Sequence, residues 1–130
     1  MVPRWRKALS LVWGVMLALT AGTLYSYGQW SLDLKAREQL TQTNVAIIGL
    51  VGDWGLYLFG APVGYLYDRF GWQLACLLAA ALQFTGYGGI WLITGSSVSF
   101  SVPLAALLLM LVGVGSAAAY CVSLQNNIKL

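Results

Sequence analysis

The stretch Gly64-Tyr65-Leu66-Tyr67-Asp68-Arg69-Phe70-Gly71 joins two long apolar segments of the chain. It places an acidic and a basic residue side by side, with a glycine before and a glycine after the pair. Charged side chains are costly inside hydrocarbon, so such a pair marks a point where the chain reaches the membrane surface. The stretch therefore predicts a tight hairpin between two transmembrane helices.

The composition of the whole chain also predicts a membrane protein. Of the 130 residues, 59% are hydrophobic and 8% are charged, whereas soluble domains carry about 25% charged residues. Histidine is absent, which removes the usual general base near neutral pH. Cys76 and Cys121 both lie inside apolar segments, which favours buried reduced thiols over a metal or redox site. We therefore expect no enzyme, no cofactor and no metal site.

Four segments are long and apolar enough to cross a bilayer, which takes about 20 residues in a helix. They cover residues 8–29, 44–67, 72–94 and 102–126, with boundaries good to a few residues. The connections are a polar linker over 30–43, the hairpin turn at 68–71, and a serine- and glycine-rich segment at 95–101. The sequence thus predicts an all-α membrane protein that forms a single four-helix domain over residues 1–130.

The basic residues divide unevenly between the two sides of the membrane if the four segments alternate in direction. Lys35 and Arg37 fall on one side, beside two acids, and the other basic residues fall on the opposite side. Those on the opposite side are Arg4, Arg6, Lys7, Arg69 and Lys129. The positive-inside rule then predicts that both termini are cytoplasmic. The net charge of +3 is too small and scattered to suggest a nucleic-acid partner.

Small residues recur on one face of several segments, which predicts close helix packing. They are Gly14, Ala18 and Gly22 in the first segment, Gly52, Gly60 and Gly64 in the second, and Gly113, Ala117 and Cys121 in the fourth. Pro62 lies inside the second segment and predicts a kink there.

Asp53 is the one acid inside a predicted span. It lies nine residues beyond Asn44, about 14 Å of helix rise, which places it near the bilayer midplane. It is either a substrate-binding or proton-coupling carboxylate, or an acid held within the bundle by hydrogen bonds or in its neutral form. Tyr25 and Gln83 are polar residues inside apolar helices, and they either line a solute pathway, hydrogen-bond between helices or lie at the membrane interface.

Asp68 and Arg69 lie at the predicted turn, too far from the midplane to touch a central solute. Asp68 could accept hydrogen bonds from free N–H groups at the start of the next helix. Arg69 could pair with acids or lipid phosphates. The glycines around the pair favour a conformational latch over simple anchoring at the surface.

This hairpin resembles the signature loop of major facilitator transporters, Gly-x-x-x-Asp-Arg/Lys-x-Gly-x-Arg/Lys-Arg/Lys. Gly64, Asp68, Arg69 and Gly71 match it, whereas residues 72–74 lack the trailing basic residues. Residues 21–27 and 30–35 resemble the first-helix segment of nodulin-like facilitators. Residues 42–44, 49, 52–57 and 60–64 resemble the fungal branch of that group.

The resemblance implies a twelve-helix carrier of two six-helix halves that moves a small solute by rocking about a central site. In such carriers the signature loop steadies one end state by contacting the opposite half, and the four matching residues inherit that role by position. Asp53 would then face the central cavity. Because the chain matches only the first four helices, we expect a fragment of a longer carrier, a truncated gene model or one part of a split protein.

Two other functions are weighed against this one. A four-helix exporter that works as a dimer would place a glutamate in its first helix, and this chain has none there. A non-transporting scaffold or regulatory subunit would bind a partner stably without solute flux. The expected partners are the lipid bilayer, an unidentified small solute, and a missing carrier half or second polypeptide. A plasma and a vacuolar membrane fit the sequence equally.

Overall fold

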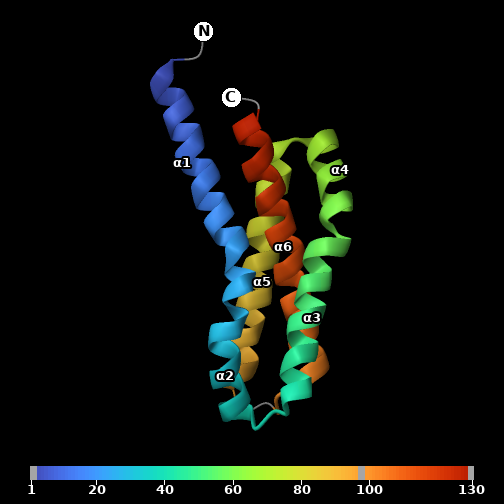
Figure 1. Ribbon diagram of the computed structural model, residues 1–130. Helices are drawn as coiled ribbons and strands as arrows, with labels where there is room; N and C mark the ends of the chain where they lie inside the picture. Colours follow the sequence, from blue (N-terminus) through green and yellow to red (C-terminus); the bar gives the residue numbers. More distant parts are fainter. Residues whose placement is uncertain (1–2, 97–98, 129–130) are drawn as a thin grey trace.

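The computed structural model describes residues 3–96 and 99–128, and all regular structure in these ranges is helical (Figure 1). The elements are α1 (Arg4–Ala21), a 3-10 helix η1 (Gly22–Ser26), α2 (Tyr27–Glu38), α3 (Gln42–Leu58), α4 (Gly60–Phe70), α5 (Trp72–Gly95) and α6 (Val102–Ile128). They form an elongated bundle. The start of α1, the end of α6 and the α4–α5 turn lie at one end of it (Figure 1).

Three helices are long and apolar enough to cross a membrane by themselves, namely residues 4–38, 72–95 and 102–128. The bent pair of α3 and α4 provides a fourth span if it is counted as one. The predicted all-α membrane fold is confirmed, with three or four spans in the part of the chain that the structure describes.

The first helical rod is longer than its predicted span, because α1, η1 and α2 continue one another over 35 residues. Residues 30–38, which the sequence predicts as a polar linker, are therefore helical, and the connection to α3 covers only residues 39–41. Ser31 and Leu34 are buried, so tertiary packing extends the helix beyond its apolar part. Gln39 ends the helix in the left-handed conformation (φ 49°), and the Thr41 side chain caps α3.

The second span is broken at Phe59, where α3 and α4 meet at an angle of 40°. Pro62 has no N–H group, so the carbonyl of Leu58 cannot receive the usual helical hydrogen bond. Helical bonding resumes with the Val63 N–H, which donates to the Phe59 carbonyl at 3.0 Å. The kink predicted from Pro62 is therefore present, one turn before the proline.

α6 is the central helix, and α1, α3, α4 and α5 all pack against it. Its most apolar stretch is 56% buried, compared with 17% for the rod formed by α1 and α2. Glycines permit the closest of these contacts. Gly113 of α6 lies against the backbone carbonyl of Gly52 in α3, and Gly55 of α3 lies against the carbonyl of Met110. On the other side, a β-carbon on Gly115 would lie 3.0 Å from the Ala79 carbonyl oxygen of α5.

The predicted packing faces are occupied at some glycines and open at others. Gly14 of α1 lies against Asn127, and its carbonyl accepts a hydrogen bond from the Ser123 hydroxyl at 2.7 Å. In contrast, a β-carbon on Gly22, Gly60 or Gly64 would meet nothing within 4 Å. Within the described residues, these three positions therefore do not mediate helix packing.

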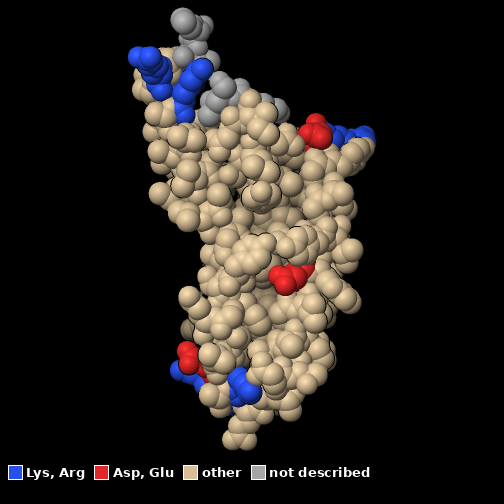
Figure 2. All heavy atoms as spheres, in the orientation of Figure 1, with Lys and Arg blue, Asp and Glu red and all other residues tan. Residues whose placement is uncertain are grey.

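Charged residues gather at the two ends of the bundle, and most of the surface between them is uncharged (Figure 2). The first turns of α1 carry Arg4, Arg6 and Lys7, and Arg69 lies near the α4–α5 turn at the same end. Lys35 and Arg37 lie in the last turn of α2, at the opposite end. Lys129 lies outside the described residues. The end that holds both chain termini is thus the more basic one among the described residues.

We predict that replacing Gly113 by alanine destabilises the bundle by about 1–3 kcal/mol, the usual cost of forcing a methyl group into a packed interior. The matched control is Gly88→Ala, because a β-carbon at Gly88 meets nothing within 4 Å. Alanine is also more favourable than glycine inside a helix, by about 0.8–1 kcal/mol. The Gly88 variant should therefore be as stable as the unmodified chain or slightly more stable. Thermal unfolding in mild detergent measures both variants, and equal unfolding temperatures would contradict the packing role of Gly113.

We predict that the end with both termini faces the cytoplasm, because the more basic end stays inside. In a variant without the native cysteines, an impermeant thiol reagent added outside the cell should label Ser96→Cys, which is exposed between α5 and α6. It should leave Pro3→Cys unlabelled until the cells are opened. The reverse labelling pattern would show the opposite orientation.

Candidate functional site

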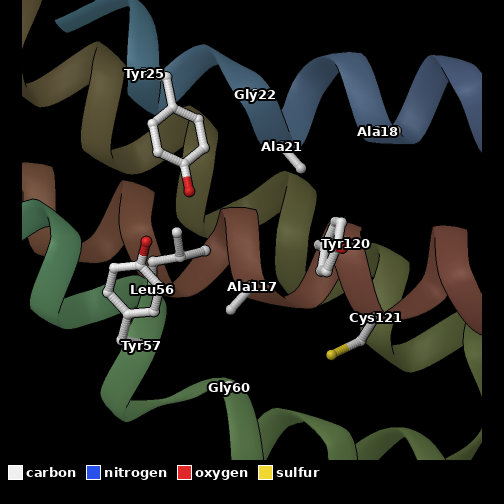
Figure 3. A pocket seen from close by; sticks show the side chains of 10 residues that line it. All are labelled: Ala18, Ala21, Gly22, Tyr25, Leu56, Tyr57, Gly60, Ala117, Tyr120 and Cys121. Atoms are coloured by element: carbon white, nitrogen blue, oxygen red, sulfur yellow. The ribbon is translucent and has the colours of Figure 1, made fainter.

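A groove of about 480 Å³ opens between three helical segments. The α1–η1 junction and the α3–α4 junction form two of its walls, and the C-terminal half of α6 lies between them (Figure 3). The lining residues are Ala18, Ala21, Gly22, Tyr25, Leu56, Tyr57, Gly60, Ala117, Tyr120 and Cys121. Its volume falls within the range of about 300–1,000 Å³ that is usual for small-molecule sites.

The groove follows from two irregular points in the helices. On one wall, α1 changes to the 3-10 helix η1 at Gly22, and on the other, α3 ends at Phe59 and α4 starts at Gly60. Small residues face the space at both points, and Ala117 of α6 lies at the same level (Figure 3). The same glycines that find no helix partner thus leave room for a ligand.

Three tyrosines supply the side-chain hydroxyl groups among the residues that line the groove. The side chains of Tyr25 from η1 and Tyr57 from α3 extend toward one another, with their hydroxyl groups facing across the space (Figure 3). Tyr120 of α6 lies farther along, near Cys121 (Figure 3). Their side chains are exposed by 66%, 70% and 52% respectively, so the ring faces are available to a ligand.

Asp53 lies next to this groove rather than among the residues that line it. It precedes Tyr57 by four residues in α3, a spacing that puts two side chains on the same helix face. α3 carries no other acid, and Figure 2 shows an acidic surface at mid-height of the bundle.

The Asp53 carboxylate is half-buried and makes no hydrogen bond or ion pair within residues 3–96 and 99–128. An acid at the bilayer centre costs about 2.5–3.5 kcal/mol on insertion scales, so it usually faces a cavity or a partner. The hydrogen-bonded interpretation of Asp53 therefore has no support among the described residues. A position beside a groove agrees with an acid that faces a cavity. The role of Asp53 in substrate binding or proton coupling stays a prediction.

Gln83 does not line the groove and lies in the packed region between α1, α5 and α6. Its side-chain amide donates to the Thr20 carbonyl oxygen and to the Ser116 hydroxyl oxygen, both at 3.2 Å. This geometry favours the helix-bridging interpretation of Gln83. Tyr27 and Tyr87 act similarly, because their hydroxyls donate to the Val45 carbonyl and the Thr23 hydroxyl across helix boundaries.

The hairpin turn depends on Gly71, which ends α4 with φ 86° and ψ 174°. This region of backbone space is essentially restricted to glycine. Asp68 does not cap the start of α5, contrary to our expectation. Its carboxylate instead accepts a hydrogen bond of 3.4 Å from the Gln125 amide near the end of α6. Arg69 donates to the Tyr65 hydroxyl at 2.9 Å, one turn earlier in α4.

The sequence alone did not single out Tyr57 and Tyr120 as site residues. The spacing of four between Asp53 and Tyr57 could have found the first, because it places both on one face of α3. Nothing in the sequence around Tyr120 shows which face of α6 points to the groove. Among the described residues, no group of three or more histidine, cysteine, aspartate or glutamate side chains is arranged to hold a metal ion.

Comparison with known proteins identifies the family. A model of the nodulin-like family matches residues 4–129, nearly the whole chain. The chain belongs to the nodulin-like family. It is also similar to the protein NUCLEAR FUSION DEFECTIVE 4 of Arabidopsis thaliana, with 28% identity over 113 residues, or 87% of the chain. The matched region is only 19% of the length of that relative. No solved structure matches this nodulin-like chain.

We predict that Gln83→Leu loosens the packing of α1 against α5 and α6, because both amide hydrogen bonds are lost. A net loss of about 0.5–1.5 kcal/mol per hydrogen bond is typical. The matched control is Gln73→Leu, because Gln73 is exposed near the start of α5. Faster cysteine labelling along α1 in the Gln83 variant would measure the loosening. Equal labelling in both variants would count against the bridging role.

Proposed function

We propose that this nodulin-like chain forms part of the solute pathway of a major-facilitator-type secondary carrier that works by alternating access. The observation that carries the proposal is the groove at the two irregular helix junctions, with an unpaired acid beside it. In secondary transporters, solute and coupling-ion sites typically lie near the bilayer midplane and are formed by discontinuous helices. The nodulin-like family model, which matches residues 4–129 of the chain, supports the same proposal. The four signature residues of the hairpin also support it.

The hairpin suits the role of a conformational latch. The contact between Asp68 and Gln125 joins the end of α4 to the end of α6 at the surface of the bundle. At 3.4 Å it is a long, weak hydrogen bond, which a small movement can break. Because α4 is already bent against α3 at Phe59, a change in that bend would move Asp68 away from α6.

The remainder of the pathway must come from other helices, supplied by a longer form of the chain, a second polypeptide or a second copy. The chain spans less than a fifth of the relative that it resembles. The open face at Gly64, which does not line the groove, is suitable for such helices, because small residues allow close approach in lipid. Transport by the complete assembly, with both chain termini in the cytoplasm, is therefore part of the proposal.

We predict that Asp68→Ala lowers chain-dependent solute uptake about tenfold, the effect of roughly 1.4 kcal/mol on a barrier, while the amount in the membrane stays the same. The measurement is uptake of a panel of labelled small solutes by cells that express the chain within its complete carrier assembly, compared with cells that lack the chain. Asp33→Ala is the matched control, because Asp33 is an exposed acid near the end of α2 at the opposite end of the bundle.

Uptake by Asp68→Ala at the level of the unmodified chain would reduce the hairpin to a surface anchor. If no solute in the panel enters in a chain-dependent way, and the chain is recovered in a stable complex with another membrane protein, the scaffold or regulatory function would replace the carrier.

A further inference from the structure

We propose that the groove binds a small organic cation, a quaternary or protonated amine, against the rings of Tyr25, Tyr57 and Tyr120, with Asp53 as its counter-charge. The inference rests on the proposed function in one respect, namely that the groove faces a solute rather than lipid. It names the chemical class of that solute from the charges, rings and shape of the groove.

The charge distribution around the groove favours a cation. Asp53 is the one acid in α3, and α4 carries its only charges, Asp68 and Arg69, in its last turn. The described lysines and arginines all lie near the ends of the bundle, in the first turns of α1, in α2 and at the end of α4. An anion in the groove would thus lie near a carboxylate that flanks the groove, and within the described residues it would find no basic side chain there.

The aromatic residues favour a cation for a second and independent reason. Tyrosine faces attract ammonium groups through the ring quadrupole, and aromatic cages are a recurrent way of holding quaternary ammonium ligands. Tyr25, Tyr57 and Tyr120 come from three different helical segments, and all are at least half exposed. Figure 3 shows Tyr25 and Tyr57 with their hydroxyl ends toward one another and Tyr120 farther along the groove. A cation in the groove would thus lie against exposed rings that come from three segments.

The rest of the lining suits the methyl groups of such a ligand. Alanines, glycines, Leu56 and Cys121 present mostly apolar surface, and the side-chain hydroxyl groups of the lining are those of the three tyrosines. A polyol or sugar would need several convergent hydrogen-bond partners, and the groove offers few. A compact cation with an apolar shell matches both the apolar walls and the nearby carboxylate.

Choline is a direct probe, because 3,3-dimethylbutan-1-ol has nearly the same shape without the charge. Membranes that contain the full chain are incubated with labelled choline, and unlabelled choline, tetramethylammonium or the neutral alcohol is added as competitor. We expect saturable binding that both cations displace, and that the neutral alcohol displaces at least about tenfold less well, the ratio that a modest electrostatic and cation–π contribution produces.

Variants locate the binding in the groove. Asp53→Asn should weaken choline binding about tenfold or more, whereas Asp53→Glu should restore part of it, because the charge is kept. Tyr57→Leu should weaken binding more than Tyr57→Phe, since the ring face rather than the hydroxyl holds the cation. Asp33→Asn removes an acid at the far end of the bundle and should leave binding unchanged. Each variant is compared at an equal amount of inserted protein.

Three results would overturn the inference. The first is absence of saturable choline binding by the unmodified chain, and the second is equal displacement by the neutral alcohol. The third is unchanged choline affinity in Asp53→Asn, whatever Tyr57→Leu does, because the charge at position 53 would then not hold the cation.

The outcome is separable from the proposed carrier function. Chain-dependent uptake of an anionic or neutral solute, without choline binding, would leave the carrier in place and remove the cation site. Choline binding in the groove without chain-dependent uptake of any solute would leave the cation site in place and remove the carrier function.

Discussion

The close backbone contact of α6 with α3 and α5 is the constraint on which the rest of the structure depends. Lipid tails are as apolar as leucine, so burying apolar side chains gives helices little reason to associate within a bilayer. Here the contacts are made at Gly113, Gly55 and Gly115, where backbone atoms of neighbouring helices approach each other directly. Any larger side chain there would push the helices apart and move Ala117 away from the walls of the groove.

The groove lies where the helices are least regular, and this location has a physical reason. Pro62 removes a hydrogen bond from the Leu58 carbonyl, and a backbone group without a partner is not tolerated against lipid. Such groups occur in membranes only where protein or a water-filled cavity surrounds them. The break at Phe59 adjoins the groove residues Tyr57 and Gly60, so the same face must be either covered by further helices or wetted.

Hydropathy predicted the helical spans well, because the apolar stretches and the charged hairpin are local features of the sequence. It placed the end of the first helix too early, because a helix can continue with polar residues beyond the hydrocarbon. The burial of Ser31 and Leu34 depends on contacts with other segments, which hydropathy does not report. Tyr25 lines the groove and Asp53 lies beside it, so their role at a site stays a prediction, whereas Gln83 bridges helices. Tyr57 and Tyr120 were missed because the direction of a side chain around a helix is set by packing.

The exposed surface of the bundle is mostly apolar, yet its faces differ in whether contact with lipid alone can satisfy their side chains. Large apolar side chains on α1, such as Trp13 and Leu19, are exposed by 66% and 63%, and contact with lipid satisfies them without any partner. An acid at mid-depth is different, because hydrocarbon offers it neither a counter-charge nor a hydrogen-bond donor. Apolar exposure alone therefore does not single out a functional face, whereas Asp53 does. The face that carries the groove is the one that must meet something polar, which makes it the part of this chain on which a function can depend.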